Sequence, residues 1–179
     1  MRKTTFLFFS LLVIAFSMSS CLNGFDSQTT PEMDFGMVYV NPQFSNDTLI
    51  GAQDTLKSYY DEELGCPRLD TIQLGDTIMF GAVFYSNMNR LVNIHATFDT
   101  TRVDLWFGID IEKKEFKAAF KEDSDPTKGV LNFNPICNML TFPIYIVPEE
   151  AGSHRVKVTV VSDSEYSTND ASFVLPVKN

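Results

Sequence analysis

The sequence predicts an all-β fold, an antiparallel sandwich of two sheets with an N-terminal extension. Two patterns indicate it: apolar and polar residues alternate along short runs, and Gly, Pro, Asn or Asp stand where the runs stop. A third observation agrees, because no segment sustains the 3.6-residue period of an amphipathic helix. The pattern is clearest in residues 77–85, where every second residue from Ile78 to Phe84 is apolar.

The expected strands follow one another at short intervals, as in a sandwich or barrel. They occupy residues 35–40, 69–74, 77–85, 91–98, 103–111, 130–133, 140–147, 154–161 and 171–177. Residues 41–65 are irregular, with a short helix as one reading of 52–60. Residues 116–120 fit either a strand or one helical turn.

The first twenty residues have the three zones of a secretory signal. Arg2 and Lys3 are positive, residues 6–16 are apolar apart from Ser10, and small residues precede Cys21. The apolar run is shorter than the roughly 20 residues that a membrane span needs.

Residues 18–21, Met-Ser-Ser-Cys, resemble a loose bacterial lipobox. This resemblance implies cleavage before Cys21 and acylation of its sulfur and new amino group. Two or more acyl chains anchor a protein stably, whereas one is marginal. The alternative is an ordinary secreted protein with a cysteine near its cleavage site.

Cleavage leaves 159 of the 179 residues and removes two basic residues, so the formal net charge changes from −9 to −11. So acidic a chain repels nucleic acid and anionic lipid, and we expect membrane attachment through the lipid alone. The expected division is a signal peptide (1–20), a tether (21–33), an N-terminal strand and irregular extension (34–66) and a sandwich (67–179). We expect a lipid-anchored position in the cell envelope, at the outer membrane, with the face left open.

Two cysteines remain after lipidation, Cys66 and Cys137. Export to an oxidising compartment permits a disulfide between them. The alternative, two separate thiols, stays open. Neither cysteine nor histidine shows the close spacing of zinc ligands, so we expect no metal or cofactor.

Residues 150–156, Glu-Ala-Gly-Ser-His-Arg-Val, are similar to the start of strand F in immunoglobulin-like domains. There an aromatic residue hydrogen-bonds back to the backbone at the corner before the strand. The resemblance puts His154 at that aromatic position and Val156 at the position of the strand-F cysteine. As a whole, the chain resembles small Bacteroidales lipoproteins with one immunoglobulin-like domain.

No catalytic constellation is evident. His95 lies on the polar face of its expected strand and His154 on the apolar face, so we expect them not to converge. The sequence has no nucleophile elbow, zincin helix or phosphate loop. The acidic groups at 122–125 and 163–165 are interpreted as solvated turns and not as calcium sites. We therefore expect no enzymatic activity.

Trp106 is the strongest candidate for a binding contact. It shares one face of its expected strand with Asp104, Gly108 and Asp110, and exposed aromatic side chains stack on sugar rings or anchor protein partners. The alternative is that another segment covers it or that it lies at a sheet edge.

Asp-Thr followed by an apolar residue or Thr occurs five times. The pattern resembles the O-glycosylation acceptor of Bacteroidales envelope proteins, and Thr48 and Thr55, expected in loops, are the favoured acceptors. The alternative is that Asp-Thr simply opens strands after turns.

These observations favour a non-enzymatic envelope lipoprotein that binds an unknown envelope protein or a glycan, or assists assembly. The alternative is a small carbohydrate-active enzyme or an accessory glycan-binding module of a sugar-uptake system.

Overall fold

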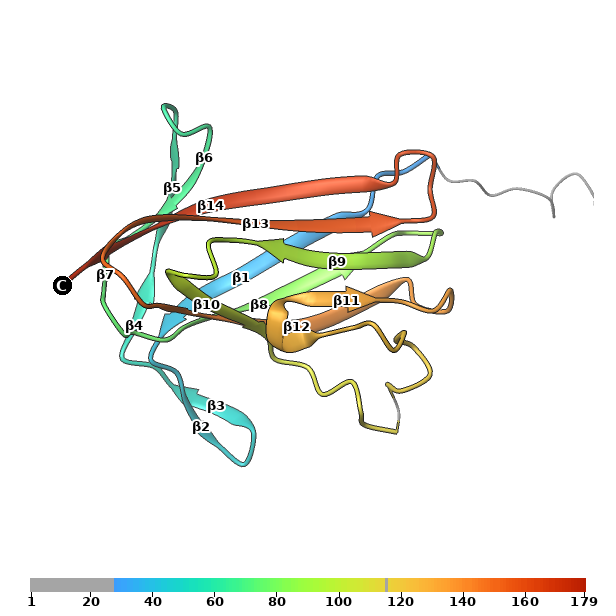
Figure 1. Ribbon diagram of the computed structural model, residues 1–179, viewed down its shortest axis with the longest axis horizontal. Helices are drawn as coiled ribbons and strands as arrows, with labels where there is room; N and C mark the ends of the chain where they lie inside the picture. Colours follow the sequence, from blue (N-terminus) through green and yellow to red (C-terminus); the bar gives the residue numbers. More distant parts are fainter. Residues whose placement is uncertain (1–27, 115) are drawn as a thin grey trace, which may run out of the picture.

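A computed structural model describes residues 28–114 and 116–179. The expected signal peptide and Cys21 lie outside these residues. The fold is a β-sandwich of two sheets, with a separate β2–β3 hairpin (Figure 1). No helix in the described part of the chain is long and apolar enough to cross a bilayer.

The five-stranded sheet has the order β10-β12-β8-β1-β4. All four of its neighbouring pairs are antiparallel. Its strands are β1 (Glu32–Val40), β4 (Asp54–Leu56), β8 (Ile78–Tyr85), β10 (Val103–Phe107) and β12 (Met139–Pro148).

The seven-stranded sheet has the order β11-β9-β13-β14-β6-β5, with β7 also pairing with β14. Its strands are β5 (Ser58–Asp61), β6 (Cys66–Leu69), β7 (Ile72–Gln73), β9 (Leu91–Thr97), β11 (Val130–Asn132), β13 (Gly152–Ser162) and β14 (Thr168–Lys178). The hairpin consists of β2 (Gln43–Ser45) and β3 (Thr48–Gly51), and the short 3-10 helix η1 is Pro126–Lys128.

The core lies between the two sheets. Alternation along each strand sends one set of side chains inward, so Phe84 of β8 and Val158 of β13 are completely buried. Aromatic rings fill the five-stranded side: Phe84 stacks on Phe142 with ring centroids 5.2 Å apart, and Phe80 meets Phe173 edge-on at 5.6 Å. The sandwich predicted from alternating residues is confirmed.

The strand arrangement is that of an immunoglobulin-like sandwich. The order β10-β12-β8-β1 repeats the D-E-B-A order of that fold, and β9-β13-β14 repeats C-F-G. One departure is that β10 precedes β11, so the chain changes sheet at each step from β9 to β12. A second is that the short strands β6 and β7 pair with β14 in parallel, whereas the other pairs of the sandwich are antiparallel.

His154, near the start of β13, hydrogen-bonds back to the corner that precedes the strand, as the resemblance implied. Its side chain is buried, and Nε2 lies 2.8 Å from the carbonyl oxygen of Glu150, four residues upstream. Because a carbonyl only accepts, Nε2 carries the proton and donates. Val156 is fully buried in the neighbouring inward position, facing the core with no cysteine partner.

The N-terminal part of the chain differs from expectation in three ways. β1 lies between β8 and β4, so the boundary expected at residue 67 separates strands that pair within one sheet. Residues 52–60 form no helix and contribute β4 and part of β5. β1 also begins at Glu32, inside the expected tether (21–33), and a bulge between Phe35 and Val38 interrupts its register with β8.

Two other expected elements are shorter or irregular. β10 ends at Phe107 and not at residue 111. One further hydrogen bond to β12 follows the strand, from the amide of Gly108 to Pro143 O at 2.7 Å. Residues 116–119 form turns, and Phe120 makes an isolated bridge to Phe133.

Candidate functional site

Trp106 packs against a tyrosine on the solvent side of the five-stranded sheet. It lies directly opposite Tyr145 of β12, and the two rings stack with centroids 5.1 Å apart and planes 9° from parallel. Both point outward, because the alternate residues Leu105 and Phe107 are buried in the core. Both remain partly exposed.

This pair continues into a row across the sheet. Tyr145 lies opposite Met79 of β8, and Met79 lies opposite Tyr39 of β1. We call Trp106, Tyr145, Met79 and Tyr39 the aromatic row; neighbouring strands are about 4.8 Å apart, so it spans about 14 Å. Met79 keeps only 6% exposure although it is on an outer face, so its neighbours cover it. Burial also raises the pKa of the Tyr145 phenol, because a less hydrated site disfavours the phenolate.

A strip without long side chains runs beside the row. We call Gly108, Pro143 and Gly81 the glycine strip; Pro143 lies opposite Gly81, and Gly108 is bonded to Pro143 through its amide. A Cβ at position 108 would lie 2.5 Å from Cε2 of Tyr145, so the tyrosine ring occupies the space that a larger residue would need. Gly81 differs, because a Cβ there would have nothing within 4 Å. The flank of the row is therefore open at Gly81, whereas at Gly108 it is filled by Tyr145 and Pro143.

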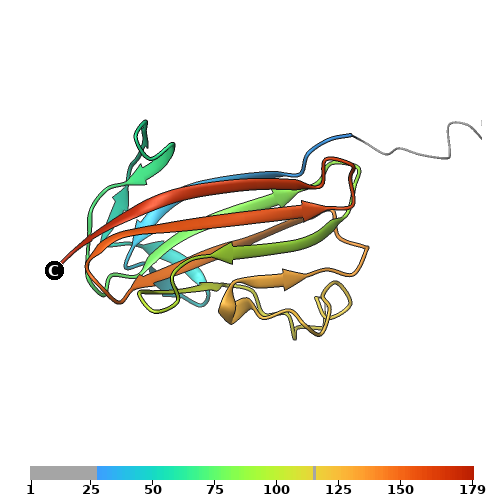
Figure 2. The same ribbon diagram turned by 45° about the horizontal axis from the view of Figure 1, so that its top comes forward.

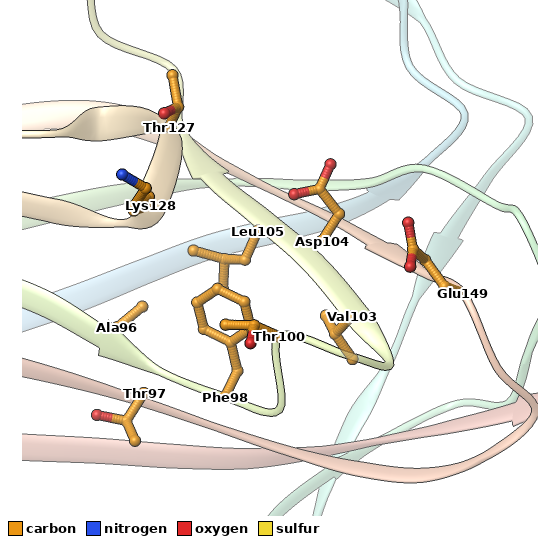
Figure 3. A pocket seen from close by; sticks show the side chains of 10 residues that line it. All are labelled: Ala96, Thr97, Phe98, Thr100, Val103, Asp104, Leu105, Thr127, Lys128 and Glu149. Carbon is orange, nitrogen blue, oxygen red and sulfur yellow. The ribbon is translucent and has the colours of Figure 1, made fainter.

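A cavity of about 570 Å³ opens beside the edge strand β10, between β9 and η1 (Figure 3). Phe98 and Leu105 form its apolar part, and the carboxylates of Asp104 and Glu149 lie on one side, away from Lys128. Asp104 is two residues before Trp106 and shares its outer face, so the cavity and the aromatic row adjoin.

The cation at this cavity already has a partner. Lys128 Nζ lies 2.8 Å from Asp125 Oδ2, and Thr127 Oγ1 donates to the same carboxylate at 2.6 Å. The bonds from Lys128 and Thr127 lower the pKa of Asp125, and the bond to Asp125 raises the pKa of Lys128. The acidic group at 122–125 is thus tied into a turn through Asp125.

The two histidines lie on opposite faces of the seven-stranded sheet, as expected from their strand positions. His95 is on the outer face, where its Nδ1 lies 2.6 Å from Asn93 Oδ1 and donates to it, because that amide oxygen only accepts. His154 faces the core. They do not form a joint acid–base or metal site, and within 28–114 and 116–179 no three His, Cys, Asp or Glu side chains are placed to hold a metal ion.

Cys66 and Cys137 are both free thiols, so the disulfide considered from the sequence is not formed. Cys66 is buried on β6, whereas Cys137 precedes β12 of the other sheet. Burial raises the pKa of the Cys137 thiol, which also contacts the carbonyl oxygen of Met139 at 3.3 Å.

The two favoured acceptor threonines are exposed but lie on strands and not in loops. Thr48 begins β3, and Thr55 lies in β4 opposite Tyr39. Thr55 therefore ends the same line of outward positions as the aromatic row.

Sequence reasoning identified Trp106 but missed the other three members of the row. Tyr145 alternates with buried residues in β12, which is a usable signal for an outward aromatic residue. Alignment of the four strands depends on long-range register, which the sequence does not display.

No known protein family matches the sequence, and no curated protein matches it. Similar solved structures include a family 123 glycoside hydrolase from Clostridium perfringens, with 15% identity, a TM-score of 0.40 and coverage of 84% of this chain and 27% of that one. A FixG-related protein from Vibrio parahaemolyticus has 6% identity, a TM-score of 0.39 and coverage of 83% and 97%. The cupredoxin domain of amoB from Nitrosocaldus yellowstonii has 12% identity, a TM-score of 0.34 and coverage of 57% and 56%.

The chain thus spans just over half of the cupredoxin domain and about a quarter of the hydrolase. These scores are too low to inform function, and the fold assignment rests on the strand pairing described above.

Proposed function

We propose that this chain is a non-enzymatic, lipid-anchored binding module of the bacterial cell envelope that holds a glycan on its five-stranded sheet. The observation that carries the proposal is the stack of Trp106 on Tyr145, aligned with Met79 and Tyr39 across four strands. A preformed row loses little conformational freedom on binding, which favours affinity.

The chemistry of this surface suits a sugar chain. The apolar face of a sugar ring packs against an aromatic ring, while its hydroxyl groups need polar partners nearby. Asp104 lies at the Trp106 end of the row and Thr55 at the Tyr39 end. Gly81, in the glycine strip, provides space for a sugar unit lying beside the rings. We therefore favour a glycan over a protein partner.

A carbohydrate-active enzyme is a second candidate, favoured by the two carboxylates beside the cavity at β10. Asp104 and Glu149 lie on one side of it, and glycoside hydrolysis commonly uses two carboxylates. Both residues are exposed, however, whereas the acid of such a pair is kept protonated by apolar surroundings. A reducing-end assay on soluble polysaccharides, with Glu149→Gln as control, would detect turnover; we expect none.

The single tryptophan makes the binding proposal testable, because Trp106 is the chain's only strong fluorophore of its type. We expect soluble polysaccharides such as xyloglucan, starch or mucin glycans to include one that shifts or quenches Trp106 emission in a saturable way. Retardation in a gel containing that polysaccharide should be lost in Trp106→Ala. Absence of both effects over a wide panel would contradict the proposal, and cross-linking to an envelope protein through Trp106 neighbours would favour a protein partner instead.

The anchor is tested separately. We expect native protein to remain in the membrane fraction after a high-salt wash and Cys21→Ser to be released. Retention of Cys21→Ser would contradict the lipid anchor and leave the glycan proposal untouched.

A further inference from the structure

The N-terminal end of the described chain is fixed at one end of the sandwich. Gln28 Nε2 donates to Glu165 Oε2 at 3.0 Å, and Ser164 Oγ donates to the carbonyl oxygen of Thr29 at 2.9 Å. Asn169 Nδ2 donates to Pro31 O at 2.9 Å. These bonds hold the start of the chain beside the turn between β13 and β14 (Figures 1 and 2).

Exposed apolar side chains gather in the loops at this same end. We call Met88, Ile136, Met139 and Tyr166 the anchor-end patch; their exposed fractions are 63%, 65%, 60% and 55%. Met139 lies opposite Tyr85, whose hydroxyl donates to Glu32 at the start of β1 at 2.7 Å. The patch therefore lies at the same end of the sandwich as the start of β1.

Hydrogen bonds join the loops that carry the patch. The amide of Ser86 donates to Asn138 O at 2.9 Å, and the amide of Leu91 donates to Cys137 O at 2.7 Å, so the Met88 turn is bound to the Ile136 loop. The amide of Asp163 donates to Arg90 O at 3.0 Å and joins the Tyr166 turn to them. The loops that carry the exposed apolar side chains are thus held together by backbone hydrogen bonds. Exposed apolar clusters mark surfaces that another body covers.

The short length of chain between Cys21 and this end favours the membrane as the partner that covers the patch. Only seven residue steps separate Cys21 from Gln28, and they span at most about 25 Å. If Cys21 carries acyl chains, as the proposed function holds, this end of the sandwich stays within about 25 Å of the bilayer. We propose that the anchor-end patch rests in the interfacial layer of the membrane, with Met88, Ile136 and Met139 inserted and Tyr166 at headgroup level.

This docking would orient the binding module. β1 runs from the anchor end, where Glu32 pairs with Tyr85, to the far end, where Val40 pairs with Ile78. The strands lie along the long axis in Figure 1, so docking by one end points them away from the membrane. The outer face of the five-stranded sheet would then stand clear of the lipid and remain open to a ligand.

Fluorescence depth measurement on the lipidated full chain tests the inference. In a Cys66→Ala, Cys137→Ser background, a solvent-sensitive NBD label is placed at Met88→Cys or Met139→Cys. Ile50→Cys, 65% exposed in the β2–β3 hairpin at the far end, is the matched control. Each protein is reconstituted into phosphatidylcholine vesicles with plain or brominated acyl chains, and flotation is measured alongside.

We expect blue-shifted emission and at least twofold stronger quenching by brominated lipid at positions 88 and 139, with neither effect at position 50. Equal emission at all three positions in protein that floats with the vesicles would overturn the docking inference and leave the anchor intact. Failure to float would overturn the anchor itself, and the docking inference with it.

Discussion

The outer faces of the two sheets differ in how far their side chains bond to one another. On the seven-stranded sheet the polar groups bond to one another: Lys157 Nζ lies 2.8 Å from Asp170 Oδ2, Thr159 Oγ1 donates to Asp170 Oδ1 at 2.7 Å, and His95 bonds to Asn93. On the five-stranded sheet Trp106 stacks on Tyr145 within the aromatic row, and Gly81 beside the row leaves space for a ligand. The first face is internally satisfied, whereas the second retains ring surface that a ligand can cover.

The largest expected effect is on the free energy of unfolding, when a buried residue at the centre of each outer face is truncated. Met79→Ala should destabilise the fold by about 2–3 kcal/mol, because Met79 is nearly buried between two tyrosines and its removal leaves a cavity. Thr159→Ala, at an equally buried position of the other face, should cost about 1 kcal/mol, since it loses one hydrogen bond. Urea unfolding measures both. A smaller cost for Met79→Ala than for Thr159→Ala would show that the row is loosely packed.

The second largest effect should be on ligand affinity, which a substitution on the five-stranded face should lower and one on the seven-stranded face should not. Tyr145→Ala removes the ring on which Trp106 stacks, and we expect at least a tenfold loss of affinity for the polysaccharide that quenches Trp106, about 1.4 kcal/mol. Lys157→Ala on the opposite face should change affinity less than about twofold. Isothermal titration calorimetry gives both values, and equal losses would place the binding site elsewhere.

A smaller effect on stability is expected at Gly81. A Cβ there meets nothing within 4 Å, and a β-branched residue favours a strand, so Gly81→Val should stabilise the fold by about 0.5–1 kcal/mol. The new side chain would fill the glycine strip, so affinity should fall while stability rises. Gly108→Ala is the contrasting variant, because its Cβ would collide with Tyr145. Unchanged affinity in Gly81→Val would show that the ligand does not lie over the strip.

The sequence was sufficient for the parts of the fold that depend on local alternation. β8, β9, β13 and β14 were predicted close to their observed bounds, because each has a continuous apolar face. β1 was predicted only from residue 35, and its place inside a sheet depends on pairing with β8 between residues 38 to 53 positions apart in the sequence. β10 was extended too far, because Ile109 and Ile111 continue the alternation after the strand pairing ends.

The candidate site was predictable only in part for the same reason. Trp106 stood out as one aromatic residue among polar neighbours, and His154 was placed correctly because its corner is a local motif. The row needs Tyr145, Met79 and Tyr39 at matching heights on three other strands. A shift of one residue in any strand would send its side chain to the core, and local pattern does not display that register.

The smallest predicted effect is electrostatic and belongs to the satisfied face. The bond from Lys157, and then that from Thr159, hold the pKa of Asp170 below its usual range. A carboxyl with a lowered folded pKa stabilises the fold above its unfolded pKa, about 3.9, and loses that contribution as pH falls through the folded pKa. The pair is nearly half exposed, so Asp170→Asn should cost only a few tenths of a kcal/mol at pH 7, less in high salt. Urea midpoints should therefore differ slightly at pH 7 and converge as the pH falls below the unfolded pKa and through the lower folded one. A difference that grew on acidification would mean that the carboxylate is not stabilised by its partners.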